Sequence, residues 1–125
     1  PAVIKKYVLE TEINGKQYHL IQVTFEKDGG GKDHEDVFLY WIEKETYTMD
    51  YLAYSYESDG GGIRFREAIN RRTIGDILFQ DYINYEPADK NTPLDKMESL
   101  YKAGELKKLS NIVLEDVSVK ALPGK

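Results

Sequence analysis

The sequence has no cysteine among its 125 residues, and only two histidines. The lack of thiols excludes thiol catalysis, iron–sulfur clusters, thiolate zinc sites and a disulfide scaffold. A chain of this length can bury roughly two thirds of its unfolded surface, so it needs neither a disulfide nor a metal to fold. His19 and His34 lack zinc-site spacing, and we predict no metal and no cofactor.

Basic charge is also scarce, because 17 Lys and Arg residues face 22 Asp and Glu residues and leave a net charge of −5. Nucleic-acid binders collect basic residues on one face, since neutralising phosphates supplies much of their affinity. The densest basic groups here are flanked by acidic residues: Arg64, Arg66, Arg71 and Arg72. We therefore expect no nucleic-acid partner.

Long apolar runs are missing, which excludes a transmembrane helix and an N-terminal signal peptide within this sequence. The composition, 41% hydrophobic and 31% charged, is that of an ordinary globular protein, and the length predicts one domain over residues 1–125. Because the sequence begins at Pro1 rather than at Met, we expect Pro1 to be a processing site and an N-terminal part to be missing.

Short segments rich in β-branched and aromatic residues dominate the sequence. Asn14-Gly15 between two such segments is a strong hairpin signal, because a type I′ turn needs positive φ at both central residues. Arg71-Arg72-Thr73 is interpreted as another turn. The predicted strands span residues 3–13, 16–27, 35–43, 47–57, 63–70, 74–85 and 109–120.

One helix is predicted before the last strand. Thr92 is suited to the N-cap, Pro93 to the first helical position, Asp95 to an acidic capping box, and Gly104 to the C-terminal stop. The order predicts an α+β fold: a curved, half-barrel-like antiparallel meander of about seven strands, with one helix before the last strand.

Two glycine-rich loops, 28–34 and 58–62, carry acidic residues and should lie at the same end of a meander. Clustered carboxylates could hold calcium there, although the spacing does not match an EF-hand. Two polar turns are the simpler interpretation, and neither loop has the pattern of a phosphate-binding loop.

Strands 16–27, 35–43 and 47–57 are apolar or aromatic on both faces, whereas a half-exposed sheet is polar on one face. Either a second element, a second chain or a missing N-terminal segment covers the spare face, or the sheet lines a cavity for an apolar ligand. Arg64 and Arg66 share a face at period two. We expect them to pair with Glu57, Glu67, Asp76 or Asp81; the alternative is an anion clamp.

Several phrases of the sequence resemble a bacterial family of unknown function whose members look like secreted lipoproteins of the outer-membrane lipoprotein-carrier type. The likeness lies in residues 39–43, 53–56, 60–67, 79–82 and 92–94. The resemblance implies a curved antiparallel half-barrel over a helix, export to the periplasm or outer membrane, and no known enzyme activity. Because members of that family look longer, it also implies that this chain is the C-terminal portion of its protein.

We therefore expect a non-enzymatic cell-envelope protein that binds a lipid or another hydrophobic or amphipathic ligand on its sheet. The aromatic residues would hold the apolar part and the arginines an anionic head. The candidate ligand-binding residues are Tyr40, Trp41, Tyr51, Tyr54, Tyr56, Arg64 and Arg66. Which face of the sheet is concave stays open at this point.

Two other functions remain open. The spare apolar face could instead contact another chain, as in a homo-oligomer or an interaction module. A hydrolase or isomerase with His34 as base and Arg64 and Arg66 holding an anion is the third alternative, but no Ser–His–acid combination supports it and we predict no catalytic residue.

Overall fold

A computed structural model describes residues 3–25, 37–56 and 61–115. Its seven strands form one antiparallel sheet whose spatial order follows the sequence from β1 to β7. The strands are β1 (Val3–Ile13), β2 (Lys16–Phe25), β3 (Val37–Glu43), β4 (Met49–Tyr56), β5 (Gly62–Ile74), β6 (Ile77–Glu86) and β7 (Lys107–Ile112). A single-turn 3₁₀ helix, η2 (Leu94–Lys96), leads into α1 (Met97–Lys102).

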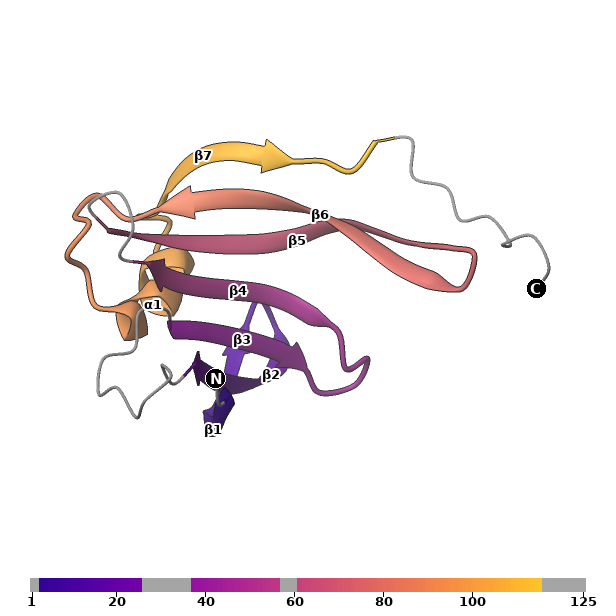
Figure 1. Ribbon diagram of the computed structural model, residues 1–125, viewed down its shortest axis with the longest axis horizontal. Helices are drawn as coiled ribbons and strands as arrows, with labels where there is room; N and C mark the ends of the chain where they lie inside the picture. The colour runs from indigo at the N-terminus through magenta and orange to yellow at the C-terminus, as the bar shows by residue number, and fades with distance from the viewer. Residues whose placement is uncertain (1–2, 26–36, 57–60, 116–125) are drawn as a thin grey trace.

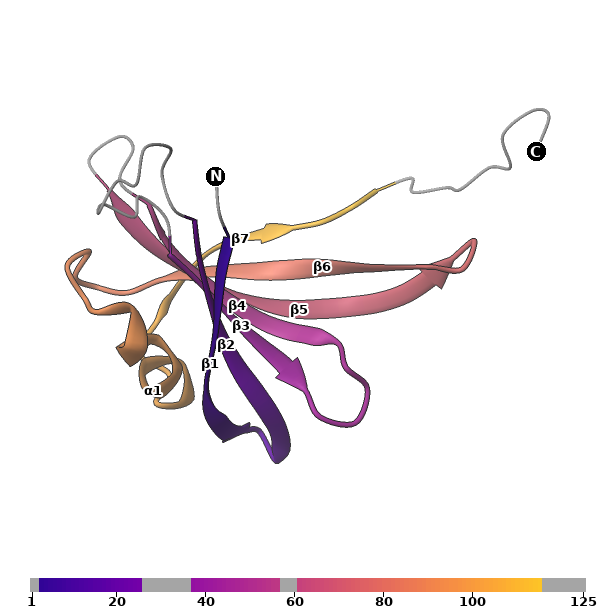
Figure 2. The same ribbon diagram turned by 60° about the horizontal axis from the view of Figure 1, so that its bottom comes forward.

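The meander and the helix before the last strand confirm the expected α+β order (Figure 1). The sheet is strongly twisted and stays open, with α1 beneath one face at one end (Figure 2). Most of the described chain is strand, and the helical part is shorter than predicted.

Of two predicted hairpin turns, the first is confirmed and the second is wrong. Asn14 and Gly15 have φ of 51° and 81°, which confirms the β1–β2 turn. The predicted turn at Arg71-Arg72-Thr73 is wrong, because β5 continues to Ile74. The chain reverses at Gly75 and Asp76, whose φ values of 59° and 67° fit a type I′ turn.

Other element boundaries also differ from the prediction. Strand β4 begins at Met49 rather than residue 47, because Tyr47, with φ of 57°, still belongs to the turn. Strand β7 spans Lys107–Ile112 instead of 109–120, of which residues 116–120 lie outside the described part.

The helix cap is another correction. The Thr92 hydroxyl donates to the Asp89 carbonyl and does not cap a helix, and neither η2 nor α1 has a side-chain N-cap. Gly104 does end the helix, with φ of 73° and its N–H donating to the Tyr101 carbonyl.

The two faces of the sheet follow from the register. Leu20, Trp41 and Tyr51 form one cross-strand row, and Leu39, Ala53 and Phe65 form the next. These residues are buried with Met97 of α1, so we call the face that carries them the inner face. The opposite, outer face carries Tyr40, Leu52 and Arg66 in one row and Phe38, Tyr54 and Arg64 in another.

We expect Gly15→Ala to lower the free energy of unfolding by about 1–2 kcal/mol, because alanine is strained at a φ of 81°. A Cβ at Gly15 meets no atom within 4 Å, so the loss reports backbone conformation alone. Chemical denaturation measures it, with Asn14→Gly as the control that keeps the turn. An unchanged midpoint in Gly15→Ala would contradict the turn assignment.

Candidate functional site

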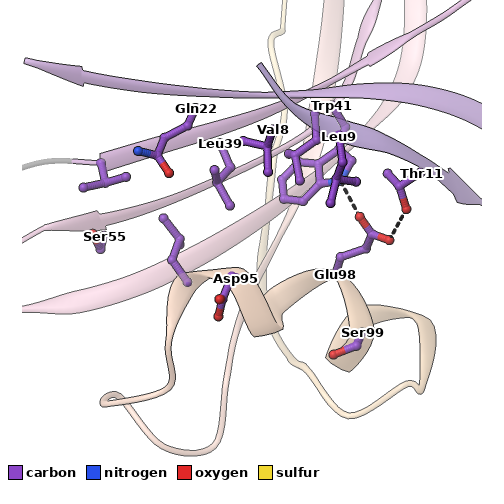
Figure 3. A pocket seen from close by; sticks show the side chains of 13 residues that line it. Val8, Leu9, Thr11, Gln22, Leu39, Trp41, Ser55, Asp95, Glu98 and Ser99 are labelled. Carbon is purple, nitrogen blue, oxygen red and sulfur yellow. Dashed lines mark hydrogen bonds between the residues drawn. The ribbon is translucent and has the colours of Figure 1, made fainter. Parts of the chain in front are cut away.

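A cavity of about 550 Å³ lies between the inner face and the helical segment (Figure 3). Strands β1 to β4 form one wall, and η2 and α1 form the other. Its apolar lining residues are Val8, Leu9, Leu20, Val37, Leu39, Trp41 and Leu94. Its polar lining residues are Thr11, Gln22, Ser55, Asp95, Glu98 and Ser99. The volume and the mixture of apolar walls with a few polar groups are typical of small-molecule sites.

A β-bulge shapes the edge of this cavity. The β1–β2 register shifts between Tyr7 and Leu9, so Val8 is the extra residue. Regular alternation would turn Val8 and Leu9 to opposite faces, yet both line the cavity. The bulge therefore adds a second apolar side chain to the inner face of the edge strand.

Glu98 connects the helix to two strands. Its Oε1 accepts a hydrogen bond of 2.7 Å from the Trp41 indole N–H of β3, and its Oε2 accepts one from the Thr11 hydroxyl of β1 (Figure 3). Lys102 donates to the same Oε2 from one helical turn away, at 3.0 Å. These contacts hold α1 across the cavity.

The charge on Glu98 is stabilised in this position. Burial raises the pKa of the carboxyl group, but the hydrogen bonds from Thr11, Trp41 and Lys102 outweigh it and hold the pKa below its usual value. Glu98 is therefore ionised at neutral pH. It is an acceptor, not a proton donor, toward anything that enters the cavity.

Buried aromatic residues pack against one another on the inner face. Phe65 is 0% exposed and contacts Trp41, Tyr51, Tyr85 and Tyr101, with ring centroids between 4.8 and 6.3 Å from its own. Burial and the Glu67 carboxylate raise the pKa of Tyr85 to about 12. This tyrosine stays neutral at physiological pH and packs rather than acting as a phenolate.

A polar network closes the inner face near the hairpin turns. The β3–β4 register shifts at Asp50, whose carboxylate accepts from the Tyr18 hydroxyl at 2.8 Å, from Thr48 and from Arg71. Burial, followed by this bond to Asp50, raises the pKa of Tyr18. The donors and acceptors of this network form hydrogen bonds with one another, so the network stabilises the fold.

The structure divides the seven predicted site residues between the two faces. Trp41 and Tyr51 lie on the inner face, and Trp41 alone among the seven lines the cavity. The other five lie on the outer face: Tyr40, Tyr54, Tyr56, Arg64 and Arg66. The sequence had left open which face a ligand would use, and the two groups do not meet.

The outer-face residues interact with one another. The Arg66 guanidinium lies 5.3 Å from the Tyr54 ring centroid and donates to its hydroxyl, and Arg64 lies 5.6 Å from the Tyr56 ring centroid. Arg64 pairs with Glu86 at 3.6 Å. Arg64 therefore does not pair with Glu67, Asp76 or Asp81, and the fourth predicted partner, Glu57, lies outside the described ranges. Two other arginines form ion pairs with aspartates: Arg71 pairs with Asp50, and Arg72 pairs with Asp81.

Sequence reasoning missed Glu98 and Gln22. The sequence did contain a signal for Glu98. This residue falls between Leu94 and Tyr101 at helical spacing, so its carboxylate lies on the apolar stripe of the helix. Gln22 sits on the inner face of β2 opposite Leu39, and the period-two pattern places it there without indicating a cavity.

The predicted catalytic and calcium sites have no counterpart among the described residues. His34 and the calcium hypothesis for the glycine-rich loops fall largely on residues 26–36 and 57–60, outside the described ranges. Within those ranges no cluster of three His, Asp or Glu residues could hold a metal ion. No helix of the described part is long and apolar enough to cross a membrane.

One family model, described as a family of unknown function (DUF6503), matches residues 1–115. Neither the curated proteins nor the solved structures include a match to the chain. None of these comparisons links the chain to lipoprotein carriers. Because the match spans nearly the whole sequence, the chain belongs to this family of unknown function.

Proposed function

We propose that the protein is a non-enzymatic binder of hydrophobic or amphipathic small molecules, and that the inner-face cavity is the binding site. The single observation that carries this proposal is the cavity of about 550 Å³ between the sheet and the helix. Its walls are largely aliphatic, with Trp41 at one side and neutral polar groups such as Gln22 and Ser55 at others. Such a lining favours an apolar chain with one polar end.

The absence of a reactive arrangement at this cavity agrees with a binding role. Its lining offers hydroxyls of Thr11, Ser55 and Ser99, with no histidine among the described lining residues to activate them. Glu98 is occupied by three donors, including the Trp41 indole. The cavity offers apolar walls and a few polar groups for a polar end, which suffices for binding.

Trp41 gives a direct optical test, because it is the only tryptophan in the chain and it lines the cavity. We expect an apolar ligand such as decan-1-ol to change its fluorescence in a saturable manner. Gln22→Phe should narrow the cavity, remove one of its polar groups and weaken binding about tenfold or more. His19→Phe is the matched control, because His19 lies on the same strand but on the outer face.

The test has clear contrary results. If decan-1-ol and longer alcohols leave the Trp41 signal unchanged, the proposed function is wrong. If Gln22→Phe and His19→Phe bind equally well, the ligand does not occupy the inner-face cavity.

An interaction module is the second candidate, favoured by the apolar residues that the sheet leaves accessible. Ile4, Tyr7, Ile77 and Leu78 are 42–53% exposed and lie on β1 or beside the β5–β6 turn. Analytical ultracentrifugation tests this alternative. A concentration-dependent dimer that Tyr7→Ser dissolves would support it, and a monomer at every concentration would count against a homo-oligomer.

We also propose a location in the cell envelope. Only the sequence resemblance to secreted lipoproteins supports this location. Fractionation of cells that express the native gene tests it, and a purely cytosolic fraction would contradict it.

A further inference from the structure

We propose that the inner-face cavity selects amphiphiles whose polar end is neutral or positively charged, and disfavours a carboxylate such as that of a fatty acid. This inference rests on the proposed function, and it names the class of ligand. The observation behind it is that two carboxylates, Asp95 and Glu98, line the cavity, while its described lining contains no Lys, Arg or His.

The two carboxylates differ in what they offer a ligand. Glu98 is half-buried and already accepts from Trp41, Thr11 and Lys102. Asp95 is exposed on η2, and no ion pair or hydrogen bond engages its side chain among the described residues. Asp95 is therefore the group that is free to attract a cationic or hydrogen-bond-donating end.

Arg64, Arg66 and Lys102 do not belong to the described lining of the cavity. Arg64 and Arg66 lie on the outer face against Tyr56 and Tyr54, across the sheet from the cavity. Lys102 lies next to the cavity but outside its lining, and its ammonium group pairs with Glu98. An entering carboxylate would meet uncompensated negative charge, in a protein of net charge −5.

Three ligands with the same alkyl chain test the inference: decyltrimethylammonium, decan-1-ol and decanoate, each followed by Trp41 fluorescence at neutral pH. We expect decyltrimethylammonium to bind about tenfold more tightly than decanoate, because one exposed carboxylate gives a modest preference. Decan-1-ol should fall between them.

Asp95→Lys should remove or reverse this preference. Glu105→Lys is the matched control, because it changes the net charge equally from an exposed residue outside the cavity lining. An equal shift in both variants would overturn the role of Asp95, since it would show a long-range effect of net charge.

The outcomes separate this inference from the proposed function. Decanoate binding as tightly as decyltrimethylammonium in the unmodified protein overturns the charge selection and leaves the binding site standing. No binding of any of the three ligands overturns the proposed function, and the inference falls with it.

Discussion

Replacing Phe65 with alanine is expected to lower the free energy of unfolding by about 3–5 kcal/mol. Phe65 is fully buried at the centre of the inner-face aromatic residues, and its ring stacks on that of Tyr101 at 4.8 Å. Truncation would leave a hole between the sheet and α1 that rigid neighbouring rings fill poorly. Because domains of this size are stable by about 5–15 kcal/mol, the variant would lose a large part of the total.

Urea denaturation followed by circular dichroism measures this loss. Tyr47→Ala is the matched control, because Tyr47 is 76% exposed and truncation of its side chain should change stability by about 0.5 kcal/mol or less. If Phe65→Ala does not fold, Phe65→Leu should still show a smaller loss of about 1–2 kcal/mol. A loss below about 1 kcal/mol in Phe65→Ala would contradict the assigned packing.

Replacing Glu98 with alanine is expected to cost about 2–3 kcal/mol, because the Trp41 indole N–H and the Thr11 hydroxyl lose their acceptor. Glu98→Gln keeps an acceptor and should cost less. Glu98→Gln should also shift the fluorescence emission of Trp41, because the indole N–H loses its hydrogen bond to an ionised group. Glu105→Gln, on an exposed neighbouring residue, is the control.

The effect of Glu98 should also depend on pH. The pKa of Glu98 in the folded protein lies below the usual pKa of a glutamate side chain, so the charged form contributes stability above that usual pKa. As the pH falls through the lowered pKa of the folded protein, this contribution is lost. The stability difference between the unmodified protein and Glu98→Gln should therefore be present at neutral pH and shrink in acid. A difference that is constant with pH would contradict the ionised state of Glu98.

The sequence predicted most of the fold because local signals and strand patterns agreed. Asn14-Gly15 marked the first hairpin, and alternating aromatic and β-branched residues located the first four strands. Gly75-Asp76 is an equivalent turn signal, and the predicted turn at Arg71-Arg72-Thr73 lies too early in the sequence. Polar residues can continue a strand where it extends beyond the core, as β5 does (Figure 1).

The site was less predictable than the fold. The period-two pattern separates Tyr51 from Tyr54 and Tyr56 but does not tell which face the helix covers. That choice depends on where Met97 and Tyr101 pack, which is a tertiary property. The bulges at Val8 and Asp50 shift the alternation of inner-face and outer-face residues by one position. No local residue preference predicts these bulges.

Intermolecular nuclear Overhauser effects test the central claim most directly, because they report which face of the sheet touches a bound alkyl chain. With decyltrimethylammonium bound, we predict contacts from its methylene protons to the methyl groups of Val37 and Leu39 and to the Trp41 ring, all in the cavity lining. Contacts instead to Ile21 and Leu52 of the outer face would contradict the account, as would a ligand that gives no contacts with the protein at saturating concentration.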